Sequence, residues 1–195
     1  NIGLRGNVPA HDTALVARLR AAGAIVAAKT NVPDMGAGAN TRNPVWGATG
    51  NPFDPRLNAG GSSGGSAAAL ATSMLPICTG SDTGGSLRIP AALCGVVGLR
   101  PSPGLVPNDD RALGWSVISV LGPMGRNVDD TALLMCASVG AHAMDPLSAP
   151  LPADDFWPLH ANERTSPREV DLSTLRVGTT EDFGLAIVDA GIRRM

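Results

Sequence analysis

The chain has 195 residues, a formal net charge of −2, 44% hydrophobic residues and 16% charged residues. This balance is typical of a globular protein with a buried core and excludes an intrinsically disordered chain. The small net charge gives no reason to expect nucleic acid or an anionic membrane as a partner. Aromatic residues make up 3% of the chain and tyrosine is absent, which argues against a stacking surface for single strands.

The chain contains three cysteines, Cys78, Cys94 and Cys136, which lie far apart among apolar or small residues. They form no Cys-x-x-Cys pair and no Cys/His spacing typical of zinc. No apolar run has the length of a membrane span, and no signal peptide is visible. We therefore expect buried, reduced thiols in a cytoplasmic protein that uses no metal and no cofactor.

The first sixty residues predict a helix, a strand and a long irregular segment. Residues 14–22 have one apolar face, and Asp12 or Thr13 can serve as the N-cap of this helix. Residues 24–28 are apolar and predict a buried strand. Residues 31–59 are rich in Asn, Pro and Gly, and a loop of this length is usually functional or covers another part of the structure.

The middle of the chain continues the alternation of helical and extended patterns. We expect helices over 63–73 and 86–93, a strand over 75–79, a strand or extended run over 94–99, and a helix over 127–139 with Asn127 as its N-cap. This alternation predicts an α/β fold with a mixed central β-sheet flanked by helices.

The last quarter of the chain has a different composition. Residues 141–170 are rich in Pro, Asp and Ala and predict a surface excursion, after which Leu175–Gly178 resumes a strand. We expect residues 1–195 to be part of a single domain. Its core would be 9–140, and residues 172–195 would contribute a strand and the start of a helix.

Two glycine-serine segments carry the most specific information in this sequence. The first is GGSSGGS at 60–66 and the second is GSDTGGSLR at 80–88, with an Ala/Leu-rich stretch and an apolar strand between them. Glycine is used where φ is positive or where the backbone must approach another group closely. Serine beside it supplies hydroxyls next to exposed N–H groups. Such segments are suited to a serine nucleophile and an oxyanion hole.

These segments resemble the amidase signature family of serine hydrolases. The resemblance rests on GGSSGGS at 60–66, GSDTGGSLRIPA at 80–91 and CGVVGLRP at 94–101, which occur in the family's order. Three shorter motifs give weaker support: Lys29–Asn31, Asn51–Asp54 and Gly122–Met124. The ordered resemblance covers roughly residues 9 to 140.

The resemblance implies a Ser-cisSer-Lys catalytic set, with Ser86 as the nucleophile and Ser62, preceded by a cis peptide bond, as the bridging serine. A serine hydroxyl is a weak nucleophile until a neighbour takes its proton, and Ser62 can relay that proton to a neutral lysine. The family's lysine belongs to an earlier segment, so Lys29, the only lysine here, is interpreted as structural. Because the chain begins at Asn1, we expect an internal portion of a longer protein that is inactive by itself.

The resemblance also implies roles for the neighbours of Ser86. The backbone N–H groups of four consecutive residues would form the oxyanion hole, namely Thr83, Gly84, Gly85 and Ser86. Asp82 and Arg88 would pair and hold this loop, and Ser63 would support it.

The implied activity is hydrolysis of a linear amide through an acyl-serine on Ser86. The expected partners are a small-molecule amide, and either a second copy of the protein or the other subunits of an amidotransferase. Two alternatives stay open, a glutaminase-type subunit of such an amidotransferase and an inactive amidase-like scaffold.

Two other classes of site fit the glycines less well. Residues 61–65 match the G-x-S-x-G nucleophile elbow of α/β-hydrolases, which requires an apolar strand just before it and a later acid and histidine. Residues 55–59 are not such a strand, and neither His142 nor His160 lies in a convincing site. A phosphate-binding loop would need Gly-Lys-Ser/Thr, which is absent.

Overall fold

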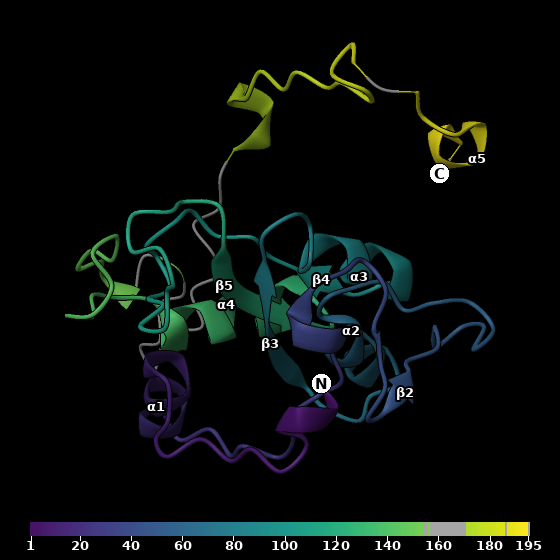
Figure 1. Cartoon of the computed structure of the whole chain (residues 1–195). Helices are drawn as coiled ribbons and strands as arrows, with labels where there is room; N and C mark the ends of the chain where they lie inside the picture. Colours follow the sequence, from purple (N-terminus) through teal and green to yellow (C-terminus); the bar gives the residue numbers. More distant parts are fainter. Residues whose placement is uncertain (154–155, 157–170, 186, 195) are drawn as a thin grey trace. The chain divides into compact units, whose positions relative to one another are not determined.

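The computed structural model describes residues 1–153, 156, 171–185 and 187–194, so His160 lies outside the described residues. The chain divides into two units, residues 1–161 and 162–195 (Figure 1). The second unit contains a 3-10 turn, η4, at Leu172–Thr174 and a short helix, α5, at Ala190–Arg193. The expectation that all of these residues belong to one domain stays a prediction.

A three-stranded sheet lies at the centre of the first unit. Its strand order is β3 (Ile77–Asp82), β5 (Val120–Gly125), β4 (Val97–Gly98), and both pairings are antiparallel. The long pair runs from Ile77 opposite Gly125 to Asp82 opposite Val120. Because Asp82 is the last residue of β3, this register fixes the point at which the second glycine-serine segment leaves the sheet.

Two helices begin within the glycine-serine segments and pack against each other, the first also against β3 and the second against β4. They are α2 (Gly64–Ala71), which begins after Ser63, and α3 (Arg88–Cys94), which ends where Gly95 adopts a φ of 67°. Their apolar side chains form one core cluster with residues of β3 and β5, consisting of Ala59, Ala67, Leu70, Cys78, Leu87, Ala91, Cys94 and Met124. The small side chains of α2 allow a close approach to the sheet.

A second cluster joins α1 (Ala14–Ala21) to α4 (Val128–Ser138), and consists of Leu15, Val106, Met135 and Val139. The predicted Asn127 cap of α4 is confirmed, since its side chain accepts the Asp130 N–H at 2.7 Å. The three cysteines are buried and form no disulfide, as expected. Burial raises the pKa of the Cys78 thiol to about 11.

The long segment over 31–59 is mostly irregular, as predicted. It contains a 3-10 turn, η2 (Asp34–Gly36), and a small hairpin of β1 (Arg42–Asn43) and β2 (Gly47–Ala48), and a further 3-10 turn, η1 (Ile2–Leu4), lies near the start of the chain. Among the described residues, no helix has both the length and the apolar character needed to cross a membrane.

The prediction of an α/β fold is confirmed, but two predicted strands are wrong. Residues 24–28 and 175–178 are not strands, and Ile25 and Val26 are 92% and 61% exposed. A strand forms only where a second segment accepts its backbone hydrogen bonds, and no described segment pairs with either of these. The strand expected over 75–79 runs from 77 to 82, and the one over 94–99 shrinks to Val97–Gly98.

Candidate active site

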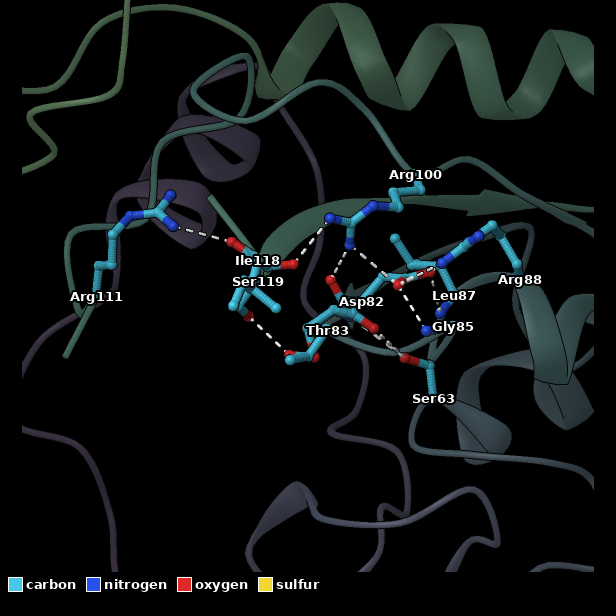
Figure 2. Close-up of polar contacts among 11 residues, drawn as sticks. Ser63, Asp82, Thr83, Gly85, Leu87, Arg88, Arg100, Arg111, Ile118 and Ser119 are labelled. Atoms are coloured by element: carbon cyan, nitrogen blue, oxygen red, sulfur yellow. Dashed lines mark hydrogen bonds and ion pairs between the residues drawn. The ribbon is translucent and has the colours of Figure 1, made fainter. Parts of the chain in front are cut away.

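The two glycine-serine segments meet beyond the end of β3. The Ser63 N–H donates to the Ser86 carbonyl oxygen at 3.3 Å, and the Ser81 N–H donates to the Ser63 hydroxyl at 3.3 Å. Figure 2 shows Ser63 beside Asp82, Thr83 and Gly85 of the second segment. The hydroxyl of Ser63, a residue that is 4% exposed, is therefore engaged with the backbone of β3.

A pocket of about 450 Å³ opens where the segments meet. Ser62 is 5% exposed and Ser86 is partly exposed, and both line this pocket. The other lining residues come from the segment around η2, from the two glycine-serine segments and from α3: Met35, Gly36, Ala37, Gly38, Ala39, Gly61, Ser81, Thr83, Gly84 and Ile89. The structure thus brings the predicted nucleophile and the predicted bridging serine to one cavity.

The backbone around Ser62 has the conformation that the resemblance implies, because the Gly61–Ser62 peptide bond is cis. A Cβ on Gly61 would lie 2.7 Å from the Gly38 carbonyl oxygen, so only glycine fits there. Thr41, which is 2% exposed, donates its hydroxyl to the Gly60 carbonyl at 2.8 Å and accepts the Gly64 N–H at 3.1 Å. Thr41 therefore holds the backbone on both sides of the cis peptide bond.

The loop before Ser86 is organised around the carboxylate of Asp82, whose residue is 0% exposed. This carboxylate accepts the N–H groups of Gly85 and Leu87, at 2.8 and 3.2 Å. It also accepts Arg88 Nε at 2.9 Å and Arg100 Nη1 at 3.1 Å, and Arg100 Nη1 donates to the Asp82 carbonyl as well.

Burial opposes the ionisation of Asp82, but the Arg88 guanidinium and the two backbone N–H groups outweigh it and hold the pKa of this carboxyl well below its usual range. The predicted pair of Asp82 and Arg88 is thus present in the structure. Arg100 joins this pair. It belongs to the quoted CGVVGLRP motif, but sequence reasoning assigned it no role.

The backbone donors of the loop are not all equivalent. Gly85 has a φ of 115°, a conformation that favours glycine, and its N–H is directed to Asp82 rather than to the pocket. The N–H groups of Thr83, Gly84 and Ser86 donate to no other residue in the described part of the chain. Of the four expected donors, three are therefore unengaged at the pocket.

The Lys-Thr-Asn motif supports helix α2. The Thr30 and Ser66 hydroxyls lie 2.9 Å apart, the Asn31 carbonyl accepts the Gly65 N–H at 3.2 Å, and Ser66 donates to the Thr79 carbonyl of β3 at 3.0 Å. Lys29 itself is exposed and is not among the residues that line the pocket. Within the described ranges, no group of three or more His, Cys, Asp or Glu side chains could hold a metal ion.

Ser62 follows a cis peptide bond and shares a pocket with Ser86, next to a glycine loop that Asp82 and Arg88 fix, which is the arrangement that the resemblance implies. The family model described as Amidase matches residues 2–195, and the chain belongs to the amidase signature family. The cis bond at Ser62, which the resemblance implied, is present in this member of the family.

The curated relatives are longer than this chain. It is 48% identical over 149 residues to the A subunit of the glutamyl-tRNA(Gln) amidotransferase from Thermus thermophilus, a match that covers 76% of this chain and 32% of the relative. The corresponding protein of Rhodopirellula baltica is 43% identical over 179 residues, or 92% of this chain and 36% of the relative. The chain thus spans about a third of the length of these relatives.

Solved structures of amidases have the same fold. A bacterial aryl acylamidase of the amidase signature family superposes with a TM-score of 0.71 at 35% identity, over 77% of this chain and 31% of that chain. A 6-aminohexanoate cyclic dimer hydrolase, solved with its substrate, gives 0.70 at 38% identity, over 76% and 32%.

Proposed function

We propose that the protein containing this chain hydrolyses a carboxamide C–N bond through an acyl-enzyme on Ser86. The observation that carries the proposal is that Ser86 and Ser62 line one pocket together with Thr83 and Gly84, whose N–H groups are unengaged by other described residues. Such N–H groups are the donors that an oxyanion requires.

The proposed reaction uses the residues as follows. The Ser86 oxygen attacks the amide carbon, and its proton passes through the Ser62 hydroxyl to a neutral lysine, which the family resemblance places before residue 1. The developing oxyanion accepts hydrogen bonds from the N–H groups of Thr83, Gly84 and Ser86. One such donor is typically worth about 3 kcal/mol in the barrier.

The C–N bond then breaks as the nitrogen takes up the proton, and ammonia or an amine leaves. Water attacks the Ser86 ester and loses its proton through the same relay, which releases a carboxylic acid and restores the serine. We propose a linear, small-molecule amide as the substrate, because the pocket of about 450 Å³ is of small-molecule size and its described lining residues carry no charged side chain.

A second candidate function is the glutaminase half of a transamidating complex. It is favoured by the relatives named as the A subunit of glutamyl-tRNA(Gln) amidotransferase, which reach 48% identity. In this case glutamine is the amide, and ammonia passes to partner subunits instead of leaving as the product.

Labelling with a fluorophosphonate tests the nucleophile in the full-length protein. We expect the label on Ser86 after peptide mapping, and its loss in Ser86→Ala. Ser102→Ala is the matched control, because Ser102 is exposed and its hydroxyl bonds to no other described residue. Labelling of Ser63 with Ser86 untouched would contradict the proposal and favour a hydrolase elbow.

Ammonia release from propionamide, benzamide and glutamine separates the two candidate functions. Turnover of simple amides by the protein alone supports a free-standing amidase, whereas release from glutamine that rises with partner subunits supports the transamidating complex. Lys29→Met should keep most of the turnover in either case. Loss of turnover in a folded Lys29→Met protein would make Lys29 the base.

A further inference from the structure

The segment 116–119 lies beside the loop before Ser86 and is held by two arginines. Arg111 Nη1 donates to the carbonyl oxygens of Ser116 and Ser119, at 2.8 and 2.9 Å. Arg100 Nη2 donates to the carbonyl of Ile118 at 2.8 Å, while Arg100 Nη1 contacts Asp82 (Figure 2). Three of the four carbonyls of this segment are therefore fixed by guanidinium groups.

Arg111 is itself fixed by a buried carboxylate. Its side chain is 4% exposed and that of Asp145 is 0% exposed, and the two form a fork with Nε–Oδ1 at 3.3 Å and Nη2–Oδ2 at 3.2 Å. Asp145 also accepts the N–H groups of Asn108 and Leu147, at 2.8 and 3.0 Å. A bidentate pair of this kind fixes direction as well as distance, which a lysine ammonium would not reproduce.

One side chain links the segment to a residue that lines the pocket. The Thr83 hydroxyl donates to the Ser119 hydroxyl at 3.1 Å, and Thr83 lines the pocket. Gly84, the next residue, has no atom within 4 Å of the position where a Cβ would lie. Thr83 and Gly84 are the two residues between Asp82 and Gly85. In the described ranges, Ser119 is the only residue whose side chain forms a hydrogen bond with either of them.

We propose that Ser119 is a positioning residue that holds Thr83, and through it the N–H groups of Thr83 and Gly84, in place for the oxyanion. The Arg111–Asp145 pair fixes the backbone from which Ser119 acts. The role rests on the proposed function, because it needs an oxyanion at these N–H groups. This role predicts that loss of Ser119 slows the chemical step and leaves the binding of a substrate or labelling reagent unchanged, since the oxyanion forms only in the transition state.

Fluorophosphonate labelling of Ser86 in the full-length protein measures the chemical rate and the binding of the reagent separately. It reports on the oxyanion site because the phosphonyl oxygen occupies the position of the oxyanion. We expect Ser119→Ala to lower the maximal labelling rate about threefold to tenfold, which is the effect of losing one hydrogen bond. The binding constant of the reagent should be unchanged. Ser119→Thr keeps the hydroxyl and should restore most of the rate. Thr83→Val should slow labelling similarly, and the double variant should be no slower than either single variant.

Ser116→Ala is the matched control, since it removes a hydroxyl from the same segment and that hydroxyl contacts no other described residue. An unchanged maximal rate in Ser119→Ala, or an additive double variant, overturns the proposal while the assignment of Ser86 stands. If Ser86→Ala is still labelled, the proposed function fails and so does the role in catalysis. Amide hydrogen exchange at Thr83 and Gly84, which should be faster in Ser119→Ala, then still decides whether Ser119 orders the loop.

Discussion

Two buried aspartates of this protein have the same kind of partners in different settings. Asp82 and Asp145 are 0% and 2% exposed, and each accepts two backbone N–H groups. Asp145 also accepts one arginine, Arg111, whereas Asp82 accepts two, Arg88 and Arg100. In both, burial opposes ionisation, but the hydrogen bonds to backbone N–H groups and to an arginine lower the pKa of the carboxyl. Both aspartates are thus charged groups whose carboxylates fix the N–H groups of segments outside helices and strands.

The two differ in where their arginines lie. Arg88 and Arg100 are six and 18 residues from Asp82, and their side chains are 56% and 25% exposed. Arg111 is 34 residues from Asp145, and its side chain is 4% exposed. Asp82 therefore shapes a local turn that opens onto the pocket, while Asp145 joins two distant segments inside the unit. We infer that loss of Asp145 costs more stability and loss of Asp82 costs more activity.

The largest expected effect on stability is that of Asp145→Asn. The substitution keeps the shape of the side chain but leaves the Arg111 guanidinium buried without a counter-charge, which typically costs about 4 kcal/mol. Urea unfolding of the full-length protein measures it. Asp110→Asn is the control, because Asp110 is exposed and its carboxylate contacts no other described residue. A change within about 0.5 kcal/mol, the usual limit for surface sites, would contradict the prediction.

Asp82→Asn should destabilise the protein by about 2 kcal/mol, because the side chains of Arg88 and Arg100 are 56% and 25% exposed and can be hydrated once their partner is neutral. Its labelling by fluorophosphonate should nevertheless fall more than about tenfold, since the N–H group of Gly85 and the turn before Ser86 lose their ionised acceptor. Asp145→Asn, under conditions where it stays folded, should lose less than this. The reverse order of labelling rates would break the comparison between the two aspartates.

The smallest effect is the pH dependence. Both folded-state pKa values are lowered, so each carboxylate contributes stability that is fully present above the unfolded-state pKa of about 3.9 and is lost as the pH falls below it. Each group contributes at most about 1.4 kcal/mol per pH unit. The stability difference between wild type and either Asn variant should be constant from about pH 5 to 8 and shrink below about pH 4. A constant difference down to about pH 3 would show that the carboxyl is not responsible.

Local sequence patterns predicted those features in which the partners lie a few residues apart. These features are the helices α2 and α3 and the cap at Asn127. The cis bond before Ser62 and the pair of Asp82 and Arg88 were implied by the family resemblance, and they too lie within short motifs. The roles of Ser62 and Ser86 in catalysis come from the family resemblance and stay predictions that the labelling experiments test.

The remaining features depend on segments that meet only in the folded chain. Nothing in the residues around Thr41 indicates that it supports the first glycine-serine segment. Likewise, nothing around Arg111 or Asp145 indicates that this pair holds the backbone at Ser119. The apolar residues 24–28 show the opposite case, because their pattern is that of a strand and no described segment pairs with them. A short motif constrains the φ and ψ angles and contacts of its own residues, whereas a long-range hydrogen bond or strand pairing is decided by which distant backbone arrives beside it.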